Sequence, residues 1–238
     1  MDTTLLGNRI PGKDFSVKIL NNAAARGDTQ LFDHLVSRGA DPHRSLALHA
    51  VSRCKDPGKS RTMIDQLLDK HHMNIEADSR ALRDLVFSRD HGTPLHCAVH
   101  CRNLTTLDHL LTRGANPESA VKYAIGNVLF QSYLPALVPL LEAGADATSA
   151  LASAWETKNV EAARLCLAHG ANPMRVVEEQ RARDVRVRAR REPGWVDDFE
   201  EEEDSDSSAD DEDRAKARAE MKALLQSVEP SREDNPAK

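Results

Sequence analysis

Short apolar segments with helical spacing run along most of the chain, and each one ends in a polar turn. In these segments the apolar residues recur three and four positions apart, which is the spacing of one helix face. The clearest are LFDHLVSR at 31–38, LDHLLTR at 107–113, LVPLLEA at 137–143 and ARLCLAH at 163–169. Because no segment alternates with the period of a strand, the pattern predicts an all-α protein.

A short phrase follows each of these segments and marks where the helix should end. It begins at Gly39, Gly114, Gly144 and Gly170, and reads Gly-Ala-Asp or Gly-Ala-Asn. Glycine supplies the left-handed residue that terminates a helix without a steric penalty. A degraded unit of the same kind lies between Met63 and Ala77. The repetition predicts stacked helix pairs.

Serines follow three of these phrases and precede the next apolar segment. They are Ser45, Ser119 and Ser149. A serine hydroxyl can accept a hydrogen bond from the first free amides of a helix. We therefore expect each serine to be the N-cap of the helix that follows it.

The segment Gly92-Thr93-Pro94-Leu95-His96-Cys97-Ala98, together with the Gly-Ala-Asp/Asn endings, resembles the ankyrin repeat family. The resemblance covers residues 14–175 in about five degenerate repeats, as in short fungal-type members. It implies an ankyrin-type α-solenoid of stacked helix pairs. In it Thr93 would cap a helix, Pro94 would be its first residue, and His96 would bond back into the loop.

The chain departs from this family pattern in three places. We expect an insert at Lys55–Lys59 between the helices of the second repeat and a long excursion at Asp78–His91. The fourth repeat has an extended connection through Leu129–Ser132. A projecting hairpin finger has room only before Gly92, so we expect most fingers to be missing.

Charge is distributed unevenly, and this sets the expected domain organisation. The net charge is −6, yet residues 193–213 alone hold twelve Asp and Glu and no Lys or Arg. Such a segment cannot bury enough apolar surface to fold. The expected order is an N-terminal tail (1–13), the solenoid (14–175), a basic capping helix (176–192), the disordered acidic linker (193–213), an amphipathic C-terminal helix (214–229) and a disordered tail (230–238).

Composition excludes several classes of protein. The chain is 40% apolar, which is too much for wholesale disorder, and it has no apolar run long enough to cross a membrane. Its N-terminus has no apolar signal segment, and its four cysteines lack the spacing of a disulfide framework. We therefore expect an intracellular protein of the cytoplasm, the nucleus or both.

Candidate sites for chemistry are weak. A metal site is conceivable where histidines and cysteines recur four positions apart on one helix, at His96, Cys97, His100 and Cys101. The resemblance, however, assigns His96 to bracing the loop, where it could not bind a metal. His49 and Cys54 form no recognisable nucleophile site. The arginines of 181–191 are diluted by acids and lack interleaved aromatics, so we expect no direct nucleic-acid binding. We expect no enzyme activity and no cofactor.

The resemblance implies a non-enzymatic scaffold that binds another protein on its concave face. The positions that would face this partner are Arg26, Arg38, Arg53, His100, Cys101, Arg113, Asn127, Glu156 and His169. The acidic segment is an alternative, intramolecular occupant, and Ser207 and Ser208 match acceptors of acidophilic kinases. An alternative function is a transcriptional coregulator or chromatin-associated factor that uses the acidic tail.

Overall fold

The computed structural model describes residues 15–82, 92–126 and 132–190, together with 216–217, 219–221 and 223–224. These residues form helices and turns and contain no strand, so the all-α prediction is confirmed. The tails at 1–13 and 230–238, the acidic linker 193–213, and Asn127, Ser207 and Ser208 lie outside the described residues. The chain divides into two compact units, Met1–Ala145 and Asp146–Lys238.

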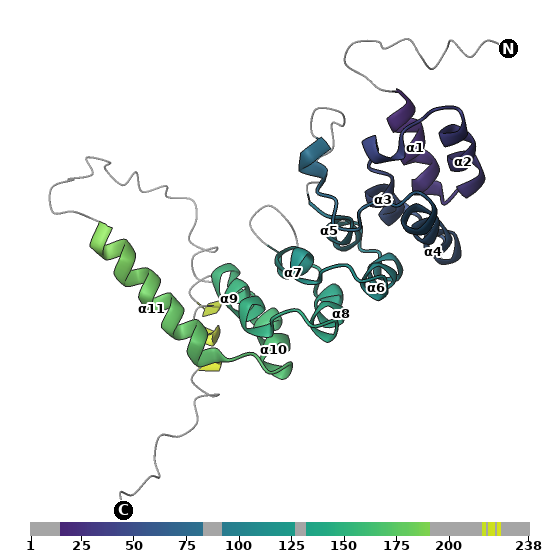
Figure 1. The fold of residues 1–238 in the computed structure, drawn as a ribbon. Coiled ribbons are helices and arrows are strands. Elements are labelled where there is room, and N and C mark those ends of the chain that lie inside the picture. Colours follow the sequence, from purple (N-terminus) through teal and green to yellow (C-terminus); the bar gives the residue numbers. More distant parts are fainter. Residues whose placement is uncertain are drawn as a thin grey trace, which may run out of the picture. The chain divides into compact units, whose positions relative to one another are not determined.

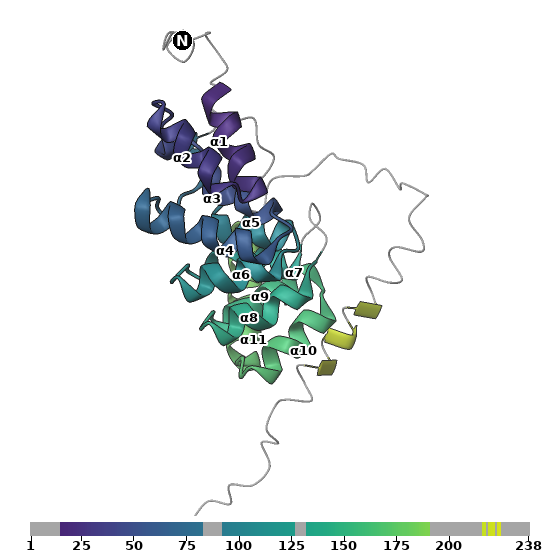
Figure 2. The ribbon, with the colours of Figure 1, turned by 90° about the vertical axis from the view of Figure 1, so that its right-hand side faces the viewer.

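The first unit is built from four helix pairs. Their first helices are α1 (Phe15–Arg26), α3 (Ala47–Ala50), α5 (Pro94–His100) and α7 (Glu118–Ile125). The second helices are α2 (Thr29–Ser37), α4 (Pro57–Asp65), α6 (Leu104–Thr112) and α8 (Leu137–Glu142). Figure 1 shows the first helices following one another in one row and the second helices in another, and Figure 2 shows the same two rows from the side.

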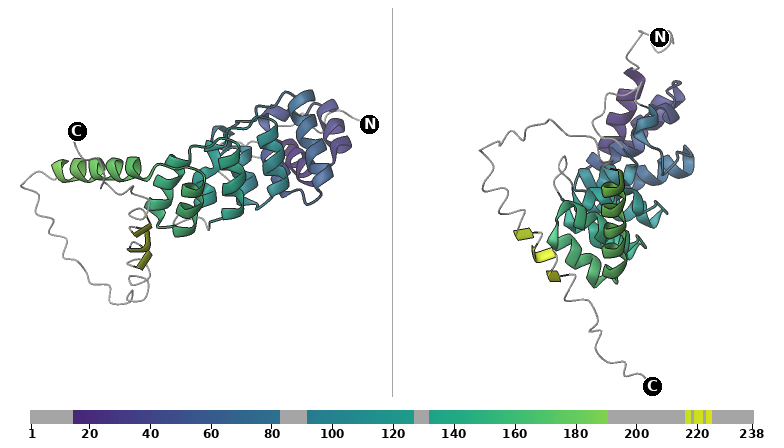
Figure 3. Two further views of the ribbon diagram at one scale, coloured as in Figure 1. Left: turned by 90° about the horizontal axis from the view of Figure 1, so that it is seen from below. Right: turned by 90° about the vertical axis from the view of Figure 1, so that its left-hand side faces the viewer.

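Short 3-10 helices and one π turn complete this unit. The 3-10 helices are Pro42–Arg44, Val51–Arg53, Ser79–Leu82 and Leu134–Ala136, and the π turn is Gln66–Lys70. The second unit contains α9 (Ala147–Thr157), α10 (Val160–Ala168) and α11 (Pro173–Arg190). Figure 3 shows α11 as one continuous light-green helix, and its Val176 is buried at 1% exposure. The helices are too short or too polar to cross a membrane in the part of the chain that is described.

Small and aliphatic side chains fill the spaces between helices. Alanines at the same place in each first helix let neighbouring helices approach closely, and larger residues from the second helices close the core. The fully buried members include Leu20, Ala23, Leu48, Leu95, Ala98, Leu107, Leu110, Ala124, Leu137 and Leu140 in the first unit.

The Gly-Ala-Asp/Asn phrase ends the second helices as the sequence predicts. Gly114 has φ +89° and Gly144 φ +98°, both left-handed. The amide of Ala115 donates to the carbonyl of Leu110 at 3.0 Å and that of Gly114 to Leu111 at 3.0 Å. The same pair of bonds recurs at the three equivalent turns, at 2.9–3.1 Å. This is the Schellman arrangement, in which the glycine allows the chain to turn back.

The start of the following helix corrects the serine prediction. Asp146 Oδ1 accepts from the Thr148 amide at 2.9 Å as the N-cap of α9, and Ser149 lies within that helix. Ser119 is likewise inside α7, with its hydroxyl donating to the Asn116 carbonyl at 2.9 Å. The acidic or amide residue of the phrase itself starts the helix, because the turn is shorter than predicted. Only Ser45 accepts from a following amide, that of Ala47 at 3.3 Å.

The turns from first to second helix use the same backbone bonds with different residues. Asn103 caps α6 by accepting from the Thr106 amide at 3.1 Å, and its own amide donates to the Ala98 carbonyl at 2.9 Å. The residue before the cap is left-handed at Gly27, Arg102 and Lys158, whereas Lys55, before the Asp56 cap of α4, is not. Asn103 Nδ2 also donates to the carbonyls of Ser52 at 3.0 Å and Cys54 at 2.9 Å. It therefore ties the third pair to the second.

The second helix pair has no insert at Lys55–Lys59, so that prediction is wrong. Asp56 is the N-cap of α4, accepting from the amides of Gly58 and Lys59, and Pro57 is the first helical residue. The extra length instead lies at the other end, where α4 continues into the π turn and His72 takes the left-handed position at φ +50°.

The Thr93 cap and the Pro94 start of the TPLH segment are formed as the resemblance implies. Thr93 Oγ1 accepts from the His96 amide at 3.3 Å, and Pro94 follows it as the first residue of α5. His49, at the place of His96 in the preceding pair, donates from Nε2 to the Gly92 carbonyl at 3.0 Å. The buried ring of His96 lies against Tyr123, with ring centroids 3.4 Å apart.

Candidate protein-binding surface

Three cationic side chains line an open hollow of about 580 Å³ at the ends of the first helices. They are Arg53, Lys55 and Arg102. Among the described residues no Asp or Glu lines this hollow. The hollow also receives Cys101 and Tyr133, so it draws on the second, third and fourth helix pairs. Its potential is therefore positive.

Helix starts add to this positive potential. Pro57 opens α4, and Leu104 and Thr105 open α6, and all three line the hollow. The amides of a helix's first turn carry a partial positive charge. In addition, the Arg102 guanidinium lies 5.6 Å from the centroid of the Tyr133 ring, a cation–π distance.

A second hollow, of about 850 Å³, lies beside the first turn of α4. Arg26 at the end of α1 and Lys59 line it, together with Asp28 and Asp56. Both aspartates are N-caps whose Oδ1 atoms accept backbone amides. Pro57 lines the first hollow and Gly58 the second, so the two hollows flank a single helical turn.

Arg38 and Arg113 occupy a different place from Arg26 and Arg53. Each is the C-cap of a second helix, α2 or α6. Each of these helices has nine residues, which is about 13 Å at 1.5 Å per residue. Because the helices of a pair run antiparallel, their C-termini lie at the end away from the hollows. The structure therefore divides the predicted surface into two groups.

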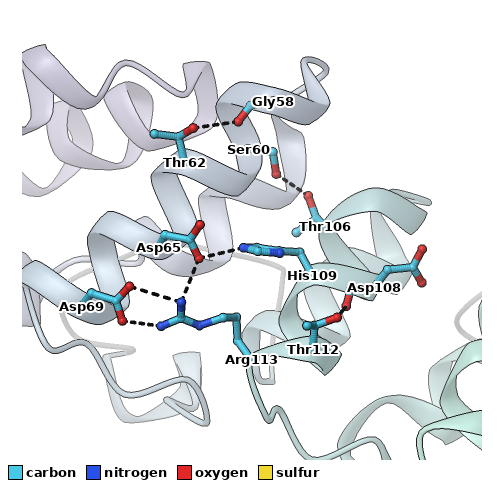
Figure 4. A network of polar contacts seen from close by, with 10 residues as sticks. All are labelled: Gly58, Ser60, Thr62, Asp65, Asp69, Thr106, Asp108, His109, Thr112 and Arg113. Atoms are coloured by element: carbon cyan, nitrogen blue, oxygen red, sulfur yellow. Dashed lines mark hydrogen bonds and ion pairs between the residues drawn. The ribbon is translucent and has the colours of Figure 1, made fainter.

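Arg113 belongs to a polar network between α4 and α6 (Figure 4). Its guanidinium contacts Asp69 and also donates to Asp65 at 3.1 Å. His109 Nε2 donates to the same Asp65 oxygen at 2.8 Å. The hydrogen bond from Arg113 lowers the pKa of Asp69 and raises that of Arg113 itself. This arginine holds neighbouring second helices together, and a partner would have to displace two carboxylates to reach it.

A similar network joins α2 to the π turn. Asp33 accepts from Gln66 at 2.8 Å, from Lys70 at 2.7 Å and from His71 at 3.0 Å. Burial acts to raise the pKa of Asp33, but the hydrogen bonds from Lys70 and His71 outweigh it and hold the pKa below its usual value. The long helix of the second pair thus bonds to the second helix on either side of it.

Comparison with known protein families identifies one of these helix pairs. The family model of the ankyrin repeat matches residues 90–122, which span the Thr93 cap, α5, α6 and the Gly114 turn. This chain contains an ankyrin repeat. A search of curated proteins finds no match.

Ankyrin repeats typically bind other proteins, and the proteins that contain them are generally non-enzymatic interaction modules. The match covers the third helix pair of this ankyrin repeat protein, where the TPLH segment is most complete. The number of ankyrin repeats and the likeness to short fungal-type members stay predictions.

The remaining predicted surface residues lie in varied settings. His100 is exposed at the end of α5, with its ring centroid 6.4 Å from that of His96. Cys101 is half-buried in the first hollow. In the second unit, Glu156 is ion-paired to Arg183 and His169 is the exposed C-cap of α10.

The sequence patterns did not predict three residues that line the hollows: Lys55, Lys59 and Arg102. A signal for two of them was present. Lys55 and Arg102 each stand immediately before the residue that caps a second helix, Asp56 or Asn103. Lys158 holds the same place before Asn159 in the second unit. Aligning the chain on its caps would have shown this recurrent basic position.

No group of three potential metal ligands comes together in the described part of the ankyrin repeat protein. Cys54, Cys97 and Cys166 are buried, and burial raises the pKa of the Cys166 thiol to about 12. A thiol with so high a pKa is protonated at neutral pH and is a poor nucleophile.

Proposed function

We infer that this ankyrin repeat protein is a non-enzymatic scaffold that binds a partner protein through the exposed ends of its first helices. The observation that carries the proposal is the pair of hollows lined by Arg26 and Arg53. They open between successive repeats, where side chains from separate helix pairs reach one ligand. His100 is exposed at the same edge.

The physical case rests on how the charges are used. Cations on the second helices, such as Arg113 and Lys70, are engaged by carboxylates of the neighbouring helix. Arg26 and Lys59 are exposed at an open hollow instead. Exposed charges of one sign raise the rate of encounter with a complementary partner and select against like-charged ones. The first-helix ends are therefore the part of the unit best suited to recognition.

Affinity capture with paired variants tests this surface. Full-length protein immobilised by a terminal tag is exposed to cell extract, beside R26E/R53E and the control R38E/R44E. The two variants change charge equally, but Arg38 and Arg44 line neither hollow. We expect the first variant to lose partners that the wild type and the control retain. Equal capture by all three proteins would place the binding surface elsewhere.

The coregulator function remains a second candidate because of the twelve acidic residues within 193–213. In that role the repeats would bind a DNA-bound regulator while the acidic segment attracts basic partners. Imaging of a tagged full-length protein tests it, since exclusion from the nucleus contradicts a role in transcription.

A further inference from the structure

The three cations Arg53, Lys55 and Arg102 define a hollow with one sign of charge, and we propose that it docks an acidic peptide segment of a partner protein. This rests on the proposed function and specifies its partner. The recognised chemistry is a run of Asp or Glu side chains in an extended segment.

Charge complementarity is the first argument. Among the described residues the lining supplies three positive side chains and no carboxylate. Two guanidinium groups can each hold a carboxylate through two parallel hydrogen bonds. A single-sign hollow attracts anions more strongly than the same charges would on a flat surface.

The polar, uncharged lining is the second argument. Thr105 and Tyr133 are hydroxyl-bearing residues of the lining, and the Tyr133 hydroxyl donates to the Arg102 carbonyl at 3.4 Å. Hydroxyls can donate to carboxylate oxygens or bridge to them through water. The Tyr133 ring also lies beside the Arg102 guanidinium, which limits the arginine's freedom before a ligand arrives.

The adjoining hollow gives the ligand a direction. It continues past the first turn of α4, where Lys59 and Arg26 supply two further cations. The carboxylates there, Asp28 and Asp56, accept backbone amides and are fixed as helix caps. A segment several residues long could therefore lie across this turn with acidic side chains in both hollows. This favours an extended acidic peptide over a single small anion.

Fluorescence anisotropy with a labelled hexaglutamate peptide tests the proposal on the full-length protein. The variant R53Q/K55Q/R102Q neutralises the hollow, and R38Q/R44Q/R61Q is the control with an equal loss of charge at exposed positions outside it. We expect binding to weaken on the order of tenfold in the first variant and about twofold or less in the second, because exposed ion pairs are individually weak but act together here. The charge-conserving R53K/R102K should bind nearly as well as the wild type.

Raising the salt from about 50 mM to about 300 mM should weaken binding to the wild type and narrow the gap between the variants. Circular dichroism checks that each variant is folded. Two results would overturn the proposal: no hexaglutamate binding to the wild type at low salt, or an equal loss of binding in both glutamine variants.

Cys101 provides a readout located in the hollow itself. It is half-buried there, whereas the other three cysteines are buried. We expect hexaglutamate to slow its reaction with a thiol reagent, and a hexalysine peptide to leave the rate unchanged. If the peptide binds without slowing this reaction, it binds elsewhere and the proposal is wrong.

Failure here is distinct from failure of the proposed function. If R26E/R53E loses partners in the capture experiment but the wild type does not bind hexaglutamate, the scaffold function stands and the acidic ligand is rejected. If hexaglutamate binds in the hollow but capture does not depend on Arg26 and Arg53, the proposed scaffold surface is rejected and the anion site stands.

Discussion

Two kinds of turn alternate along this ankyrin repeat protein. They have similar backbone conformations but different side chains. The turns after the first helices α1, α5 and α9 and the turns after second helices close with paired amide-to-carbonyl bonds and one left-handed residue. After second helices that residue is glycine in four of the five turns, followed by a buried alanine and a cap. After α1, α5 and α9 it is Gly27, Arg102 and Lys158.

The difference separates folding from recognition. A left-handed glycine and a buried alanine leave no side chain that a partner could read, so the second-helix turn serves the fold. A left-handed arginine or lysine costs conformational energy that glycine would avoid. At Arg102 this costly residue lines the basic hollow. The first-helix turns thus carry the side chains suited to binding.

The largest effect should come from adding a methyl group to the first-helix turn at Gly27. A Cβ there would lie 2.6 Å from Lys59 Cβ, at φ +64°, whereas at Gly114 it would meet nothing within 4 Å. We expect Gly27→Ala to lower the free energy of unfolding by about 2–4 kcal/mol, from strain and overpacking together. Gly114→Ala should cost about 1–2 kcal/mol from strain alone. Urea denaturation measures both, and equal losses would show that the crowding against α4 is relieved.

Asn103 should be the most important cap, because it serves two repeats. Asn103→Ala removes the bond from the Thr106 amide and both donations to the second pair, which we expect to cost about 2 kcal/mol. Ser149→Ala is the matched control within a helix and should cost less than about 0.5 kcal/mol. A large loss in the control would reinstate the serine as the cap of α9.

The sequence was sufficient for the parts of the structure that depend on local chemistry. The stops at Gly114 and Gly144 and the cap at Thr93 were predictable, because a left-handed glycine and a threonine-proline start have few other uses. The cap at Asp146 was missed because Asp146 and Ser149 lie close together and compete for one role. The partnership of Arg113 with Asp69, 44 residues away, depends on packing and leaves no local signal.

Charges on the second helices should act on stability, unlike those at the hollows. The pKa of Asp33 is lowered in the folded protein, so the unfolded chain binds its proton at a higher pH. The stabilisation is therefore present above about pH 4 and is lost as pH falls through the folded pKa. We expect Asp33→Asn to cost about 0.5 kcal/mol at pH 7, allowing for solvent screening, and to flatten the decline in melting temperature between about pH 5 and 3. Arg53→Gln should leave that profile unchanged, and a flattened profile in this variant would give the hollow a structural role.

The smallest effect on stability is expected at Arg102, where it should be opposite in sign to the effect on binding. Glycine removes the left-handed strain at φ +55°, but it also frees the unfolded chain and loses the contact with Tyr133. The balance predicts that Arg102→Gly is between zero and about 1 kcal/mol more stable than the wild type. The control Arg61→Gly, on the exposed face of α4, should lose about 1 kcal/mol because glycine disfavours a helix interior.

Binding to hexaglutamate should fall in Arg102→Gly and remain unchanged in Arg61→Gly. Chemical denaturation and anisotropy on the same samples measure both quantities. If removing a residue raises stability but lowers binding, the residue serves a contact with a partner and not the fold. If Arg102→Gly is instead destabilised as much as Arg61→Gly, the arginine belongs to the architecture of the turn, and the division between the two kinds of turn does not hold.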